Sequence, residues 1–550
     1  MKTLKDDLTK IIKGNVSNDA ATRDAFSHDA SMFELRPDVV VTPKDKYDIE
    51  AVVKYVAKNK KNCSGLSVTV RSGGTDMSGG AINSSIVLNM TPKFNKIKSV
   101  SSDAAEVQPG VFYRDFEVET LNYDALLPSY PASRDLCTVG GMVANNSGGE
   151  KSLQYGKTED FVTELEVVLA DGKSYIIKPL NKTELDTKLK QQDFEGQLYR
   201  QVFDLVDKNY DEIKAAKPNV SKDSTGYHIW NIWDRKKQVF DLTRAIVGSQ
   251  GTLGIVTNIK FRLVKAPKHS GTLVVFMKRI DHLGEFIVDV LKAKPATFEG
   301  FDNYTLWLSF KLFFYFRKKL GWLGMIKLGL QLLPSGLKIA SSMPKMVLMI
   351  EFNGDSEEEV AAKVHSMRMN LSKYNHDMLF EEDETEAKSR KFWIMRRESF
   401  NLLRQKVKDK HTAPFIDDLI VQPKYLQEFL PQLRVILKKY KFLATIAGHF
   451  GDGNFHVIPL MKIEDPKELA KIEPAMKEVS ELVMKYNGSL SGEHNDGMSR
   501  GPWLHEMYSP EVIRYFKQLK LAFDEDNIFN PHKKTDADWQ YSLDNIRSHF

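Results

Sequence analysis

Cysteine is nearly absent from the sequence. Cys63 and Cys137 are the only two among 550 residues, and they do not form a CxxC pair. Iron–sulfur clusters in proteins are held by several cysteine thiolates, so the chain is not expected to carry a cluster of its own. Scarce cysteine also favours a reducing compartment, and we expect a cytoplasmic protein.

An excess of charge of one sign is also lacking. The 78 basic and 73 acidic residues leave a formal net charge of only +5, and no arginine- or lysine-rich arm occurs, so no nucleic-acid partner is expected. No run of eighteen apolar residues is free of charge, so no membrane-spanning helix is predicted. The acidic residues in the opening "MKTLKDDLTK" do not suit a signal peptide.

Glycine, by contrast, is concentrated in three loops of the first half. The alternating stretch "LSVTV" at 66–70 predicts a strand that leads into "RSGGTDMSGG" at 71–80. A second run of small and amide residues spans 128–156, and a third Gly/Ser turn lies within 241–264. Bare backbone N–H groups in such loops suit the pyrophosphate of a dinucleotide, although a single loop of this kind is as readily a hairpin turn. The first loop is not a GxGxxG sequence opening a helix, so a Rossmann fold is not favoured.

The second half has a different pattern, in which a strand is followed by a helix. It occurs at 270–294, at 345–371 and at 415–440. Such alternation predicts a separate α+β domain, a mostly antiparallel sheet covered by helices. A length of 550 residues also predicts two or more domains.

The three loops together resemble a known family. "RSGGTDMSGG", "DLCTVGGMVANNSGG" and "VGSQGTLGIVT", in this order, resemble the FAD-binding domain of the vanillyl-alcohol oxidase superfamily. The branch resembled is the FAD-linked D-2-hydroxyacid dehydrogenases, which include D-lactate dehydrogenase and the D-type subunit of glycolate oxidase. The resemblance implies an α+β fold: a PCMH-type FAD-binding domain of two α+β subdomains at 1–268, an α+β cap domain at 269–508, and a C-terminal segment at 509–550 that returns to the first domain.

The resemblance also implies which residues would hold the cofactor. Some relatives attach FAD covalently through a histidine in the first loop; this chain has Thr75 there, so we expect non-covalent FAD. The C-terminal segment would bring Asn530 near the flavin. The implied cofactor-binding residues are Arg71, Ser72, Gly73, Gly74, Thr75, Asp76, Ser78, Gly79, Pro131, Ser133, Thr138, Gly140, Gly141, Asn145, Ser147, Gly251, Val256 and Asn530.

Two glycine-rich stretches of the second half carry histidines and a carboxylate. They are "GHFGDGNFH" at 448–456 and "SGEHNDG" at 491–497. Glycine-rich loops often carry solvated histidines, but both stretches resemble the metal and catalytic motifs of the family. The resemblance favours a divalent metal (Zn, Mn or Fe) on His449, His456 and Glu493, with positions left open for substrate. His494, beside the metal, would be the base.

The implied reaction is oxidation of a D-2-hydroxyacid, with hydride passing from C2 to flavin N5. In "FWIMRRESF" Arg396 matches the family's arginine for the substrate carboxylate, although a solvated helix charge is the alternative. The 2-hydroxyglutarate enzymes place a threonine and a lysine near the positions of Phe400 and Ile416. These differences predict a lactate-like substrate in place of a dicarboxylate.

One insertion, at 303–346, suggests where the electrons go. The stretch 305–350 contains no acid and seven basic residues among leucines and aromatics. This composition favours a membrane surface contacted through 305–345, on the inner face of the cytoplasmic membrane, with quinone as acceptor. The alternative is an insertion packed against protein, its lysines extended to water. Relatives with "GEHxDG" often continue into an iron–sulfur domain, so a separate iron–sulfur subunit is a second candidate acceptor.

Two rival functions share the FAD-binding motifs. One is a flavin-dependent transferase like alkylglycerone-phosphate synthase, but that family has a histidine triplet where "GEHN" has one histidine. The other is a non-catalytic, membrane-associated flavin-binding protein. Reduction of bound flavin by a hydroxyacid discriminates the dehydrogenase from both.

Overall fold

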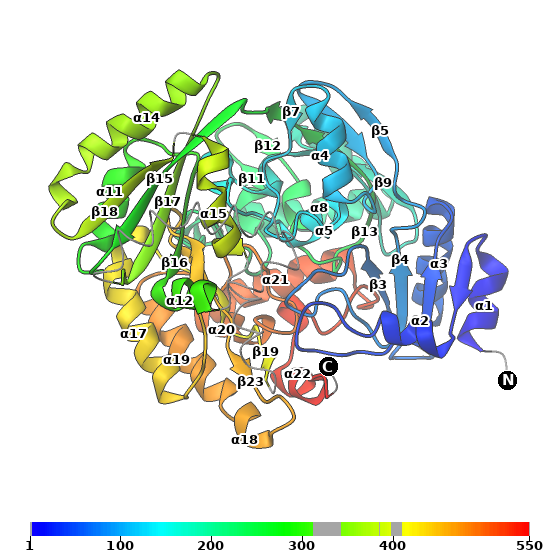
Figure 1. The fold of residues 1–550 in the computed structure, drawn as a ribbon. Coiled ribbons are helices and arrows are strands. Elements are labelled where there is room, and N and C mark those ends of the chain that lie inside the picture. The colour runs from blue at the N-terminus through cyan, green and yellow to red at the C-terminus, as the bar shows by residue number, and fades with distance from the viewer. Residues whose placement is uncertain (1–2, 312–342, 384, 398–409, 549–550) are drawn as a thin grey trace.

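The structure is a computed structural model that describes residues 3–311, 343–383, 385–397 and 410–548. The first half of the chain and the strand–helix half form two lobes, and the C-terminal segment lies between them (Figure 1). Residues of the glycine-rich loops and of the histidine motifs come together between these lobes, and this arrangement positions the site.

The first subdomain is a small sheet covered by a helix. Its strand order is β1-β2-β4-β3, and β2 and β3 both run parallel to β4. Helix α3 (Lys46–Asn59) begins at the Asp45 cap and buries a stripe of apolar residues on the sheet. The strands are β1 (Asn15–Ser17), β2 (Val39–Thr42), β3 (Val68–Arg71) and β4 (Ile86–Asn89), and the first glycine-rich loop follows β3.

The second subdomain is a five-stranded antiparallel sheet of order β5-β6-β13-β8-β9. The second glycine-rich loop leads into the short helix α5 (Val139–Asn145), and the third immediately precedes β13. Helix α21 (Pro510–Phe523) of the C-terminal segment packs on α8 (Phe194–Lys208) in the same core. The strands are β5 (Ile97–Val100), β6 (Ala104–Val107), β8 (Val162–Val168), β9 (Ser174–Ile177) and β13 (Ile255–Arg262).

The cap is a seven-stranded sheet in which every pairing is antiparallel, as predicted. Side chains alternate between its faces, so Leu273 and Val275 contact one helical layer while Val274 and Phe276 contact another. One face is covered by α11 (Leu283–Leu291), α14 (Glu357–Asn370), α17 (Leu426–Lys439) and α19 (Ile472–Lys485), and the other by α12 (Asn303–Lys311) and α15 (Glu386–Arg397).

The strand order of the cap brings distant segments together. In sheet order the strands are β18 (Met378–Asp383), β15 (His269–Met277), β17 (Met346–Gly354), β16 (Thr297–Asp302), β21 (Ile446–His449), β22 (Asn454–Val457) and β20 (Asp417–Ile420). The α+β fold with two subdomains and an antiparallel cap is confirmed.

Membrane contact through 305–345 remains a prediction. Most of that segment, 312–342, lies outside the described residues. Among the helices that the structure describes, none combines the length and apolar character needed to cross a bilayer.

Candidate functional site

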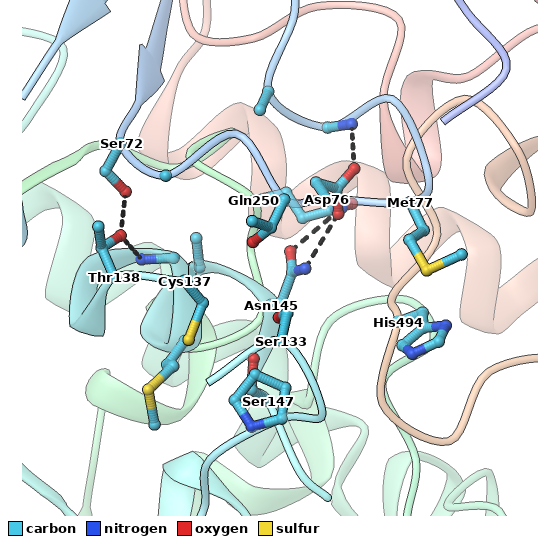
Figure 2. A pocket seen from close by; sticks show the side chains of 18 of the residues that line it. Ser72, Asp76, Met77, Ser133, Cys137, Thr138, Asn145, Ser147, Gln250 and His494 are labelled. Carbon is cyan, nitrogen blue, oxygen red and sulfur yellow. Dashed lines mark hydrogen bonds between the residues drawn. The ribbon is translucent and has the colours of Figure 1, made fainter. Parts of the chain in front are cut away.

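A cavity of about 460 Å³ lies where the two lobes meet. All three glycine-rich loops contribute to its wall, at 71–77, 131–148 and 249–256. The cap closes the other end with Arg396, Arg397, Thr412, His456, Ile458, Glu493 and His494. Loops far apart in the sequence therefore enclose one space, and the side chains of Asp76, Ser147 and His494 all line it (Figure 2).

Most of the predicted cofactor-binding residues line this cavity, but Ser78, Gly79 and Asn530 are not among the described residues of the wall. They lie behind it. The Ser78 carbonyl accepts from the Met498 amide, and a side chain on Gly79 would come within 2.9 Å of Phe33. The side-chain amide of Asn530 donates to the backbone carbonyls of Gly80 (2.8 Å) and Gln250 (2.7 Å). These three residues support the loops from behind the wall.

Asp76 joins the three loops to one another. Its carboxylate accepts from the Gly80 amide (2.6 Å) and from the Asn145 side chain (2.9 Å). The Gln250 side chain also reaches it at 3.4 Å (Figure 2). Gln250 was not identified from the sequence, where it appears as one polar residue within "VGSQGTLG". The polar contacts explain how loops from separate segments hold a common wall.

The wall suits a dinucleotide. Gly74 (φ +66°) and Gly251 (φ +69°) adopt the left-handed conformation that glycine tolerates best. Of the described residues on the wall, the histidines are His456 and His494, both at the cap end. Burial raises the pKa of the Cys137 thiol to about 12, so this thiol stays protonated and unreactive at neutral pH. These observations agree with a cofactor held without a covalent bond.

His449 and His456 are brought together by a β-hairpin. Strands β21 and β22 pair antiparallel with His456 opposite Ala447, which puts His449 and His456 on the same face. His449 Nε2 lies 3.0 Å and His456 Nε2 3.4 Å from Glu493 Oε1. All three side chains are buried, and their ligand atoms lie within 4.8 Å of one another. The predicted loop is thus a tight hairpin, and the three predicted metal residues converge.

His494 is held beside this cluster by two aspartates from β20. Its Nδ1 lies 2.5 Å from Asp417 Oδ2, and its ring stacks on His456 at 4.7 Å. Asp418 accepts from the backbone amides of Glu493 and His494, both at 2.7 Å. Burial alone would lower the pKa of His494, but the charges of Asp417 and Asp418 together have the larger effect and raise the pKa to about 10. The Nε2 side of the ring, 3.8 Å from Glu493, remains directed toward the cluster.

Glu299 connects the cluster to the predicted substrate arginine. Its carboxylate lies 2.5 Å from His449 Nδ1 and accepts from Arg396 Nε at 3.1 Å and Nη2 at 3.0 Å. Burial alone would lower the pKa of His449, but the charges of Glu299 and Glu493 together have the larger effect and raise the pKa to about 9. The sequence signal that could have identified Glu299 is an acid inside an apolar strand, "TFEGFD"; "FIDDLIV" carries the same signal for Asp417 and Asp418.

The cluster is surrounded by more carboxylates than cationic side chains. Two imidazoles and one carboxylate form a donor set that such ions accept. Five carboxylates and three side chains that are always cationic leave a formal charge of −2 when the imidazoles are neutral. The carboxylates are Glu299, Asp417, Asp418, Asp452 and Glu493, and the cations are Lys222, Arg396 and Arg500. Protons on His449 and His494 supply the same two charges when no ion is bound.

The residues used to predict the substrate are only partly informative. Arg396 lines the cavity as expected, and its neighbour Arg397 lines it too, paired at 2.9 Å with Glu150. Ile416 is fully buried in the cap core and is not among the described wall residues, so its apolar side chain does not report on the substrate. Phe400 lies outside the described residues.

The fold and the cavity define a two-domain protein built to bind a dinucleotide. The FAD binding domain family matches residues 37–177, and the family described as FAD linked oxidases, C-terminal domain, matches residues 266–534. The chain therefore belongs to the FAD-linked oxidases, as the resemblance implied.

Curated relatives that match over most of their length include a glycolate oxidase subunit and a D-lactate dehydrogenase. The chain is 28% identical over 527 residues to glycolate oxidase subunit GlcD of Bacillus subtilis, covering 94% of this chain and 93% of the relative. It is 25% identical over 520 residues to D-lactate dehydrogenase of Anaerostipes hadrus, covering 92% of each. D-2-hydroxyglutarate dehydrogenase of Pseudomonas putida is 26% identical over 532 residues, 95% of this chain. The chain spans about half the length (50%) of that last relative.

Solved structures share the fold at low identity. 4-Ethylphenol oxidase from Gulosibacter chungangensis aligns with a TM-score of 0.66 at 14% identity, covering 96% of both chains. Alkyldihydroxyacetonephosphate synthase aligns with a TM-score of 0.63 at 16% identity, covering 94% of this chain and 83% of that one. Because the two differ in reaction, this likeness describes the architecture and does not choose between an oxidase and a transferase.

Proposed function

We propose that the protein oxidises a lactate-like D-2-hydroxyacid to the 2-oxoacid with non-covalent FAD, assisted by a divalent ion at His449, His456 and Glu493. The observation that carries the proposal is the single cavity, whose wall includes the three glycine-rich loops together with His456, Glu493 and His494. Relatives named as hydroxyacid dehydrogenases over the whole length of the chain support the same reaction class.

Each residue has a task in this proposal. Bound FAD supplies a two-electron acceptor, and a divalent ion supplies a Lewis acid for the substrate oxygens. Arg396 binds the substrate carboxylate from the cavity wall. His494 takes the proton of the substrate hydroxyl at Nε2, and Asp417 stabilises the imidazolium that results. The aspartates favour the protonated ring, and a divalent ion held by His449, His456 and Glu493 would oppose that proton and so favour His494 as a free base.

The reaction class is tested by mixing the yellow holoprotein with D-lactate under anaerobic conditions. The visible flavin absorbance should bleach with D-lactate and should remain with L-lactate or with buffer alone. D-2-Hydroxyglutarate, tested in parallel, examines the preference for a short substrate. Flavin that no D-2-hydroxyacid can bleach would refute the dehydrogenase and leave the transferase and the non-catalytic flavoprotein.

The role of His494 is tested by His494→Asn. This variant should retain FAD and its visible spectrum, but its rate of flavin bleaching should fall by roughly 10²–10⁴-fold, the usual contribution of a general base. His505→Asn is a matched control, because His505 is an exposed histidine outside the cavity wall. Stopped-flow absorbance measures both rates, and equal rates in the two variants would contradict the assignment.

We also propose that the electrons pass to quinone at a membrane surface or to a separate iron–sulfur subunit. The acid-free stretch 305–350 supports the membrane surface. The unmodified protein should float with vesicles that contain anionic lipid and should stay behind with neutral vesicles. Replacing Arg317, Lys318 and Lys319 by glutamine should reduce flotation, since each basic residue near an anionic surface contributes about 1 kcal/mol. If the protein does not float with either kind of vesicle, the separate iron–sulfur subunit is favoured as the electron acceptor.

A further inference from the structure

A loop between the two matched family regions supports the catalytic loop. Residues 221–226 lie after the FAD binding domain match, which ends at 177, and before the C-terminal match, which begins at 266. The Ser224 amide donates to the Ser491 carbonyl (3.0 Å), and its hydroxyl donates to the Gly492 carbonyl (3.1 Å). The Gly226 amide donates to Asp496 Oδ2 at 2.7 Å. The loop that carries Glu493 and His494 therefore rests on residues 221–226.

Lys222 of this loop enters the histidine–carboxylate cluster itself. Its side chain is only 1% exposed, and its Nζ lies 3.0 Å from Glu493 Oε2 and 3.5 Å from Asp452 Oδ2. Glu493 Oε1 is the oxygen that lies 3.0 Å and 3.4 Å from the ring nitrogens of His449 and His456. The two oxygens of Glu493 are thus divided: one faces the imidazoles and the other is held by an ammonium group.

Lys222 acts through Glu493 and not on a substrate. It is not among the described residues that line the cavity, whereas Glu493 is. A carboxylate that coordinates with both oxygens must present both to the ion, and the ammonium of Lys222 occupies one of them. Residues that orient a metal ligand in this way commonly change metal affinity by about 10–100-fold when they are removed.

We propose that Lys222 is a positioning residue that restricts Glu493 to coordination through one oxygen, and that it thereby makes the site selective for a small ion of low coordination number. Zinc prefers few ligands with nitrogen among them, whereas manganese accepts more oxygen ligands in an octahedral arrangement. The inference rests on the metal site of the proposed function and adds a specificity determinant from outside both matched regions.

The test compares zinc and manganese binding to the metal-depleted holoflavoprotein. Dissociation constants are measured by competition with a chromophoric chelator. Lys222→Met should reduce the preference for zinc over manganese by about tenfold or more, because Glu493 can then offer its second oxygen. Lys222→Arg keeps the charge and should retain most of the preference. X-ray absorption at bound zinc should show one additional oxygen ligand in Lys222→Met.

Lys157→Met is the matched control. Lys157 is also a buried lysine; it donates to the Gly492 carbonyl (3.1 Å) of the same loop and to the Ser224 hydroxyl (2.6 Å) of the supporting residues 221–226. Its loss disturbs the loop without freeing an oxygen of Glu493, so the zinc preference should remain. Where Lys222→Met does not retain FAD, Lys222→Gln replaces it, with a smaller shift expected in the same direction because the amide is neutral.

The outcomes separate two failures. An unchanged preference and coordination number in the Lys222 variants, with ions still bound, would overturn the positioning role alone. An equal shift in Lys157→Met would also overturn it, because general loosening of the loop would then be the cause. If the unmodified protein binds neither zinc nor manganese, the metal site of the proposed function fails, and this inference fails with it.

Discussion

At the scale of single residues, the chemistry of the site depends on where two protons lie. Burial opposes the charged form of both His449 and His494, yet the pKa values are raised to about 9 and about 10. The responsible carboxylates are Glu299 and Glu493 for the first ring, and Asp417 and Asp418 for the second. Both imidazoles are therefore protonated at neutral pH when no ion is bound.

This protonation predicts that binding of an ion releases protons. His449 must become neutral to coordinate, and a divalent charge beside His494 opposes its proton as well. About one to two protons should leave per zinc ion at neutral pH. Because both pKa values are raised, release should decline and affinity should increase as the pH rises through about 9 and about 10. Calorimetry in buffers of different ionisation enthalpy measures the number, and a heat that is independent of buffer would contradict it.

Sequence reasoning reached the residues that lie in motifs and missed those that act from other segments. His449, His456, Glu493 and His494 were identifiable because two short stretches contain them. Glu299 and Lys222 join the cluster from far earlier in the chain, by 150 and 271 residues from their partners. The acid inside the apolar strand "TFEGFD" marks Glu299 as unusual, and Lys222 has no comparable mark. Neither pattern says which residue would be the partner, since only tertiary folding makes the contact.

At the scale of elements, the β21–β22 hairpin is the unit that places both histidines. Its turn, 450–453, ends in Gly453 at φ +74°, where a side chain would lie 1.8 Å from the Val421 carbonyl oxygen. The Val421 amide in turn donates to the Gly453 carbonyl at 3.1 Å. The hairpin therefore fits against the strand that precedes α17 only if this position has no Cβ.

Gly453→Ala should consequently destabilise the protein and weaken metal binding. Strain of this kind usually costs about 1–3 kcal/mol, and the backbone clash adds to it. Chemical denaturation with zinc affinity measured in parallel checks both effects. Gly65→Ala is the control, because a Cβ there meets nothing within 4 Å, and it should alter the free energy of unfolding by no more than about 0.5 kcal/mol. Equal stability of the two variants would show that the hairpin can shift.

Individual elements were more predictable than their order. In "DIEAVVKYVAKN" (48–59) the apolar residues recur at the spacing typical of a helix, and Ile49, Val52, Val53 and Val56 form the buried face of α3. Strand pairing in the cap was beyond reach, because β16 and β21 share no sequence pattern that sets their register. Pairing between them is nevertheless what brings Glu299 next to His449.

At the scale of the whole molecule, the cavity is shared between the two lobes. Ion pairs cross the same boundary, such as Lys151 to Glu351 at 3.0 Å and Arg397 to Glu150 at 2.9 Å. All four side chains belong to segments that flank the cavity or the cap sheet. Occupation of the cavity should therefore stabilise the contact between lobes as well as the loops themselves.

Removal of FAD should accordingly lower the thermal stability of the entire chain. A ligand that binds only the folded state at 100 times its dissociation constant contributes about 2.7 kcal/mol, so the unfolding temperature should rise with added FAD. Asp76→Ala should diminish that rise, because Asp76 joins the loops through Gly80 and Asn145. Asp115→Ala, which removes an exposed acid of the same domain, should leave it intact. Differential scanning calorimetry measures the shift; if FAD stabilises only a first of two separate transitions, the lobes unfold independently and the shared cavity does not couple them.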